Sequence, residues 1–188
     1  MMRIISGFYK GKKIAQPKDI KTRPLKDLTK ESIFNIINHS NKFKINLSDC
    51  DILDLFSGVG SFGIECLSRG VKSVVFVENY HGVLPILEKN LSLLNSNNYK
   101  IIKDDVYSKY IFNQFKEKFD IIFLDPPYKD IKFKNILSRI KEQKILNKNG
   151  IIILHRHKNE ENDFSQSFKI LEEKRYGISK IIFITYLH

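Results

Sequence analysis

Short apolar runs alternate with longer amphipathic stretches from residue 51 onward, and this alternation constrains the fold more than any other feature of the chain. A strand buried on both faces reads as a continuous apolar run, so the pattern is typical of a parallel sheet flanked by helices. Helices are predicted at residues 61–69, 81–94, 107–117 and 131–146. The predicted strands are DILDLF, KSVVFVE, YKIIKDD, FDIIFLD and GIIILH, which begin at residues 51, 72, 99, 119 and 150.

The two ends of the chain carry a different pattern. The stretch SFKILEEKRYGISKIIFITYL contains two alternating segments joined around Gly177, which predicts an antiparallel pair of strands. Near the N-terminus, RIISGFYKGKKIA reads as a short basic hairpin, and an amphipathic helix is predicted to begin near Asp27. Residues 38–50 are polar and are interpreted as a linker. We therefore divide the chain into an N-terminal extension, residues 1–45, and a main domain, residues 46–188.

Most of the excess positive charge lies in the N-terminal extension. The 188-residue chain has a formal net charge of +11, and residues 1–44 contain 11 Lys and Arg against three acids. This distribution favours a polyanionic partner such as nucleic acid. The two cysteines have no C-x-x-C spacing and the histidines form no cluster, so a reduced cytoplasmic setting without a metal site is expected. No apolar run approaches the roughly 20 residues that span a bilayer, and no membrane association is expected.

A glycine-rich turn follows the first strand of the main domain. In DLFSGVGSFG, Gly58, Gly60 and Gly63 have the G-x-G-x-x-G spacing of nucleotide-cofactor sites, where the backbone approaches a ligand at a helix N-terminus. A tight turn without a ligand is the alternative. Glu78 follows about 20 residues later, where a carboxylate can accept hydrogen bonds from ribose hydroxyls. Asp105, after the third strand, could bind an adenine amine or cap the next helix.

Two further features distinguish between nucleotide cofactors. Asp54 interrupts an apolar strand, where a buried carboxylate needs a cationic or hydrogen-bonding partner. The sulfonium and ammonium groups of S-adenosylmethionine would supply positive charge, whereas the pyrophosphate of NAD would be repelled. The tetrapeptide DPPY, residues 125–128, ends the fourth strand at the edge where open α/β sheets bind ligands.

The chemistry of DPPY is suited to an amine substrate. Its two prolines fix the backbone and remove two N–H donors, which leaves carbonyl oxygens and the Asp125 carboxylate as acceptors. Tyr128 offers a flat face on which a base can stack. Asp125, Pro126, Pro127 and Tyr128 are therefore the candidate catalytic residues, and methyl transfer to an exocyclic or ring-adjacent nitrogen is the predicted reaction.

The sequence resembles the RsmD family of bacterial methyltransferases nearly from end to end. The resemblance is carried by ILDLFSGVGSFGIECLSRG, FVE, FDIIFLDPPY and the opening MRIISGFYKGKKI with KTRP and ESIFNII. It implies an α/β fold, the seven-stranded Rossmann-like sheet of class I S-adenosylmethionine-dependent methyltransferases with an antiparallel last strand. It also implies methylation of the exocyclic N2 of a guanine in 16S (small-subunit) ribosomal RNA, the guanine numbered 966 in that RNA.

The resemblance and the motifs together give two sets of binding residues. The expected cofactor-binding residues are Arg23, Asp54, Phe56, Gly58, Gly60, Glu78, Asp105 and Asp125. The expected RNA-binding residues are Arg3, Lys10, Lys12, Lys13, Lys21 and Arg23. The expected partner is 16S ribosomal RNA, within an assembling 30S particle or free, bound by a monomer.

The chain also departs from the family pattern and leaves alternatives open. Leu28 stands where the family commonly has a basic residue, and His155, in HRHK, stands where an acid is expected. Because DPPY is shared with adenine-N6 DNA and RNA methyltransferases, that reaction is the first alternative. An NAD-binding oxidoreductase and a noncatalytic RNA-binding assembly factor are the others.

Overall fold

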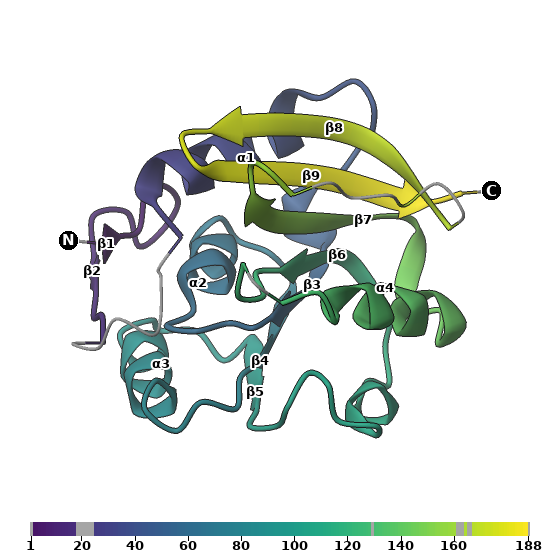
Figure 1. Cartoon of the computed structure of the whole chain (residues 1–188). Coiled ribbons are helices and arrows are strands. Elements are labelled where there is room, and N and C mark those ends of the chain that lie inside the picture. Colours follow the sequence, from purple (N-terminus) through teal and green to yellow (C-terminus); the bar gives the residue numbers. More distant parts are fainter. Residues whose placement is uncertain (1, 18–24, 129, 161–163, 165–166, 188) are drawn as a thin grey trace.

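A single seven-stranded sheet organises the protein (Figure 1). The structure, a computed structural model, describes residues 2–17, 25–128, 130–160, 164 and 167–187, so the predicted contacts of Lys21 and Arg23 lie outside the described residues. The strand order is β5-β4-β3-β6-β7-β9-β8. The strands are β3 (Asp51–Leu55), β4 (Ser73–Val77), β5 (Tyr99–Ile102), β6 (Phe119–Leu124), β7 (Leu146–His157), β8 (Phe168–Tyr176) and β9 (Ser179–Tyr186).

The strand directions confirm the predicted fold. β3 pairs in parallel with β4 and β6, β4 with β5, and β6 with β7. β9 pairs antiparallel with both β7 and β8, so the last strand runs against the other six. Parallel strands bring their carboxyl ends to one edge of the sheet, which collects the residues after β3, β4, β5 and β6 in one place.

Helices cover both faces of the sheet. Along β3, Ile52 belongs to one hydrophobic core and Leu53 to the other, because neighbouring strand residues point to opposite faces. The Ile52 core holds apolar side chains of the first three helices, and the Leu53 core holds those of the fourth. The helices are α1 (Asp27–His39), α2 (Ser61–Ser68), α3 (Leu84–Ser92) and α4 (Phe133–Glu142), with 3-10 turns η1 (Leu47–Asp49) and η2 (Ile111–Gln114).

The helix predicted at 107–117 is wrong. Only the 3-10 turn η2 forms there, and Phe115 is already extended, with φ −88° and ψ 116°. The chain must enter β6 at Phe119, and Phe115 packs edge-on against that ring at 5.4 Å between centroids. Residues 107–117 therefore pack their aromatic side chains without forming an α-helix, because the chain is already extended at Phe115 on its way into β6. Helices α3 and α4 are also shorter than predicted, and β7 is longer.

The basic N-terminus forms the predicted hairpin, with strands β1 (Met2–Arg3) and β2 (Lys13–Ile14) pairing antiparallel. A buried cluster of charged residues connects the hairpin to α2. The Glu65 carboxylate accepts hydrogen bonds from the backbone N–H groups of Ile5 and Ser6 at 2.8 and 3.0 Å. Lys30 of α1 lies 3.7 Å from Glu65, and burial lowers the pKa of its ammonium. In Figure 1 the hairpin, drawn in purple, lies beside α1 and α2.

The N-terminal extension also shares the main hydrophobic core, to which Met2, Ile4 and Ile14 contribute buried side chains. The boundary at residue 45 between the N-terminal extension and the main domain therefore remains a prediction. Among the described residues, no helix combines the length and apolar character needed to cross a bilayer.

Candidate active site

The glycine-rich turn joins β3 to α2 at the carboxyl edge of the sheet. Gly58 and Gly60 have φ of +55° and +84°, a region that favours glycine. A Cβ at Gly60 would lie 2.6 Å from the Leu87 side chain, and one at Gly63 would lie 2.3 Å from the Phe76 ring. The first two glycines therefore shape the turn, and the third lets α2 pack closely on β4.

Asp54 lies at the centre of this edge and is 1% exposed. Its Oδ2 accepts a hydrogen bond from the Gly63 N–H at 3.0 Å. Burial raises the pKa of the Asp54 carboxyl to about 8, the Gly63 hydrogen bond opposes this rise, and the neighbouring carboxylates of Asp125 and Glu78 add to it. The surroundings of Asp54 are therefore short of positive charge, and its role in binding a cationic ligand stays a prediction.

Glu78, directly after β4, is held rigidly by backbone donors. Its Oε2 accepts from the Gly58 N–H at 2.7 Å, and its Oε1 accepts from Asn79 and Tyr80 N–H groups at 2.9 and 2.8 Å. The whole Glu78 residue is 9% exposed. Oε1 has two donors, whereas Oε2 has one and retains a second acceptor position, so the fixed carboxylate can still accept a hydrogen bond from a hydroxyl group.

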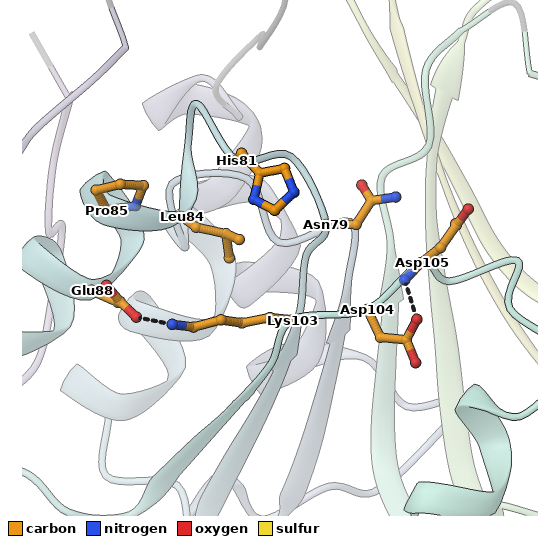
Figure 2. Close-up of a pocket in the computed structure, with 8 residues that line it drawn as sticks. All are labelled: Asn79, His81, Leu84, Pro85, Glu88, Lys103, Asp104 and Asp105. Carbon is orange, nitrogen blue, oxygen red and sulfur yellow. Dashed lines mark hydrogen bonds and ion pairs between the residues drawn. The ribbon is translucent and has the colours of Figure 1, made fainter.

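A pocket of about 530 Å³ lies beside Glu78, between the ends of β4 and β5 (Figure 2). Asn79 and Asp105 line it on one side, and Figure 2 shows an ion pair between Lys103 and Glu88, 2.6 Å long, on another. The Asp105 Oδ1 accepts from the Tyr107 N–H at 2.9 Å, so Asp105 stabilises a turn and also lines the pocket. A capping role and a ligand-binding role for Asp105 are therefore compatible.

The DPPY turn follows β6, the strand next to β3. Asp125 is 20% exposed at its side chain, and its Oδ1 lies 2.8 Å from Nδ1 of His155 on β7. Tyr128 is half-buried, with its hydroxyl 3.3 Å from His155 Nε2 and 3.2 Å from Ser179 Oγ. The Tyr128 ring meets His157 edge-on at 5.5 Å between centroids. The turn is therefore braced by β7 and β9 side chains.

Arg156 holds the backbone of this turn from inside the protein and is 1% exposed. Its Nη1 donates to the Pro126 and Pro127 carbonyls at 3.3 and 3.2 Å, and its Nη2 donates to the Tyr128 and Asp130 carbonyls at 3.0 and 2.9 Å. The sequence argument assigned the carbonyl oxygens to a ligand. The structure corrects this, because Arg156 already engages these oxygens, and the Pro127 oxygen also accepts the Asp130 N–H at 2.8 Å, which fills both of its acceptor positions.

The Arg156 guanidinium is itself fully partnered. Its Nε donates to Glu160 at 2.7 Å, and its plane lies over the Phe133 ring at 4.3 Å. Sequence reasoning noted HRHK only as a departure from a family pattern. Two consecutive side chains of that tetrapeptide, His155 and Arg156, touch the turn that DPPY forms. The sequence signal was a run of four basic or imidazole residues that follows an apolar strand at the ligand edge of the sheet.

Phe56 follows β3 with φ of +61°, in the left-handed region that is unusual for a side chain of this size. Its ring packs against Tyr107 at 5.7 Å between centroids. The Tyr107 hydroxyl donates to the Asp130 carboxylate, and burial raises the pKa of that hydroxyl. This chain of contacts links the glycine-rich turn to the segment after DPPY, so Phe56 lies at the expected edge.

The basic hairpin is connected to the glycine-rich turn through helix α3. Asn90 of α3 connects the two, because its side chain binds the Ala15 backbone and donates to the Val59 carbonyl at 3.0 Å. Phe8, between the hairpin strands, is 84% exposed. The predicted RNA-binding residues that the structure describes are all exposed, and they are Arg3, Lys10, Lys12 and Lys13.

The arrangement of these elements defines a class I methyltransferase: a seven-stranded sheet with β9 reversed, a glycine-rich turn after β3, and acidic residues after β4 and β6. Two solved structures share the fold. The Escherichia coli protein yhhF, a proposed methyltransferase, is 24% identical with a TM-score of 0.82, covering 98% of this chain and 97% of its own. The Haemophilus influenzae protein HI0767, a proposed methylase, is 27% identical with a TM-score of 0.77 and coverage of 99% and 98%.

Residues 2–185 match the family described as conserved hypothetical protein 95, and the chain belongs to this family, the RsmD family. Ribosomal RNA small subunit methyltransferase D of Haemophilus influenzae is 32% identical over 179 residues, covering 94% of this chain and 90% of the relative. Uncharacterised methylase RP545 of Rickettsia prowazekii is 30% identical, with coverage of 99% and 98%. The resemblance that the motifs indicated is thereby confirmed.

Proposed function

We propose that this protein transfers a methyl group from S-adenosylmethionine to the exocyclic N2 of a guanine in small-subunit ribosomal RNA. The observation that carries the proposal is the pair of carboxylates at the centre of the sheet edge. Asp54 is buried and short of positive charge. Asp125 directly follows the adjacent strand β6, is partly exposed and lies 2.8 Å from His155. A cationic donor and an amine acceptor would meet between them.

The described residues fit this cofactor. The Glu78 carboxylate, held by three backbone N–H groups, would accept from ribose hydroxyls, and Asn79 and Asp105 in the adjoining pocket would hold the base. The glycine-rich turn and Asp54 would hold the charged end. When bound, the cofactor supplies an electrophilic methyl group. Arg23 and Phe56 stay in this proposal as further contacts.

The protein's own part in the reaction is alignment and acceptance of a proton. The target amine would donate one N–H to Asp125, which turns its lone pair toward the methyl group. As the new bond forms, the amine becomes acidic, so a carboxylate can take its proton. Tyr128, half-buried with its hydroxyl tethered, would present its ring to the flipped or unpaired base. Pro126 and Pro127 keep the turn in place.

The basic hairpin would hold the RNA. Lys10, Lys12 and Lys13 are exposed on it, with Arg3 beside them and Lys21 further along the chain, and such contacts to phosphates weaken as salt rises. Phe8 adds an exposed aromatic face on which an unpaired base can stack. We place the reaction in the cytoplasm, with the protein acting as a monomer on free 16S RNA or an assembling 30S particle.

The proposal is tested by the chemical identity of the product. Purified protein is incubated with unmodified small-subunit RNA and with assembled small-subunit particles, each with labelled S-adenosylmethionine, and the digested nucleosides are identified by mass spectrometry. The expected product is N2-methylguanosine at one position. N6-methyladenosine would replace the proposal with the adenine reaction. No methylation, together with binding of NAD or of RNA alone, would favour the oxidoreductase or the assembly factor.

A further inference from the structure

We propose that His155 is a positioning residue that fixes the orientation of Asp125 and makes methyl transfer depend on the protonation state of its imidazole ring. This inference rests on the proposed function, because it assumes that Asp125 accepts the proton of the target amine. It assigns a role to a residue that departs from the family pattern.

Both ring nitrogens of His155 are engaged. Nδ1 lies 2.8 Å from Asp125 Oδ1, and Nε2 lies 2.9 Å from Ser179 Oγ and 3.3 Å from the Tyr128 hydroxyl. A carboxylate can only accept a hydrogen bond, so the shared proton resides on Nδ1 when Asp125 is ionised. Nε2 of the neutral ring must then accept from a hydroxyl, which Ser179 or Tyr128 can donate. His155 is 7% exposed, so these partners define its tautomer.

In this arrangement the two oxygens of the Asp125 carboxylate have different roles. Oδ1 accepts from His155, which leaves Oδ2 to accept the N–H of the target amine. The amine nitrogen bonds to the methyl carbon as the carbon–sulfur bond breaks, and that bond's electron pair goes to sulfur. The amine proton then passes to Oδ2 of Asp125. His155 keeps its Nδ1 proton throughout and steadies the carboxylate.

Protonation of His155 would weaken Asp125 as a proton acceptor. A proton added at Nε2 would face two hydroxyls, those of Ser179 and Tyr128, and both can accept it. The resulting imidazolium would pair with Asp125 and draw its negative charge away from the target amine. Transfer should therefore fall when the imidazole ring is protonated, which gives the pH profile an acid limb.

Among the residues that the structure describes, the charged and titratable groups near His155 come from the end of β6, the DPPY turn, β7 and β9. Asp125 faces it from the end of β6 and Tyr128 from the turn, and Ser179 of β9 lies against it without titrating. The guanidinium of Arg156, next on β7, is directed to the turn carbonyls and Glu160. On β9, the Lys180 ammonium donates to the Glu160 carbonyl. His157 contacts the Tyr128 ring edge-on.

The test compares two substitutions of His155. In His155→Asn the side-chain N–H can occupy the place of Nδ1 and still donate to Asp125, but it cannot titrate. In His155→Gln the amide reaches toward Ser179 and leaves Asp125 unpartnered. We expect His155→Asn to retain most of kcat at neutral pH and to move the acid limb of kcat, measured at saturating S-adenosylmethionine, to lower pH, because the imidazole no longer contributes to it. We expect His155→Gln to lose about 10-fold to 100-fold in kcat, the size of a charge-assisted hydrogen bond, with KM for S-adenosylmethionine unchanged.

His39→Asn is the matched control, because it removes an exposed histidine at the C-terminal end of α1 and should leave the acid limb in place. The nitrogen NMR shifts of His155 in the wild-type protein give a reading that needs no variant, and a proton on Nδ1 of the neutral ring is expected. An unprotonated Nδ1, or an acid limb of kcat that lies at the same pH in His155→Asn as in the wild type, overturns the inference while methyl transfer by the wild type still stands. A wild type without methyl transfer overturns both proposals.

Discussion

Replacement of Asp54 by asparagine should make the cofactor-free protein more stable at neutral and alkaline pH. The amide oxygen of the new side chain would still accept from the Gly63 N–H, but the variant would have no charge to bury at this position. The carboxyl pKa of Asp54 rises from 3.8 to about 8 on folding. At about 1.4 kcal/mol per pH unit, this corresponds to an upper bound on the order of 5 kcal/mol of folding free energy.

The sign follows from which state holds the proton. Because the folded state binds the Asp54 proton more tightly than the unfolded state, the stability contributed by this carboxyl is complete below pH 3.8 and is lost as pH rises to about 8. The free energy of unfolding of Asp54→Asn, minus that of wild type, should therefore grow by up to about 1.4 kcal/mol per pH unit between pH 5 and 7 and level off above pH 8.

The assay is urea unfolding of both proteins at pH 5, 6, 7 and 8 without cofactor. A difference in unfolding free energy that is the same at pH 5 and pH 8 would refute the reasoning. A second arm uses calorimetry of S-adenosylmethionine binding at pH 7 in buffers of different ionisation enthalpy. Wild type should release a proton from Asp54 on binding a cation, and Asp54→Asn should bind more weakly and release none.

Three further substitutions test separate parts of the structure. Gly63→Ala places a Cβ 2.3 Å from the Phe76 ring in a packed core, so urea unfolding should show a loss of about 1–3 kcal/mol, and an unchanged midpoint would contradict the packing argument. Phe8→Ala should weaken RNA binding by about 1–3 kcal/mol in a filter-binding assay while the melting temperature stays the same; equal affinity would remove Phe8 from the RNA surface. Arg156→Lys should cost about 3 kcal/mol of unfolding free energy and lower kcat, because an ammonium cannot serve four carbonyls and Glu160 together; wild-type kcat would show that the turn needs no such support.

The sequence predicted the parts of this molecule that depend on local pattern. Five apolar runs became the parallel strands, and the alternating segments around Gly177 became β8 and β9. The glycine spacing placed the turn after β3, since only residues without a side chain fit at Gly60 and Gly63. These features follow from periodicity and backbone geometry, which a single sequence displays.

The parts that the sequence could not predict depend on contacts between distant residues. Arg156 on β7 donates to the DPPY carbonyls at the end of the neighbouring strand β6, and nothing in the tetrapeptide itself indicates an internal donor. The amphipathic spacing at 107–117 suggested a helix, but packing of Phe115 on Phe119 favours an extended chain there. In the sequence, Lys30 and Glu65 likewise look like two ordinary surface charges, and nothing indicates that they form a buried ion pair.

Methyl transfer by Asp125→Ala tests the central claim most directly, when S-adenosylmethionine binding is measured on the same preparation. Loss of the carboxylate removes the acceptor for the amine proton but leaves Glu78 and the glycine-rich turn intact. The expected result is cofactor affinity close to wild type and transfer reduced by at least about 100-fold. Transfer at the wild-type rate by this variant would contradict the assignment of the active site.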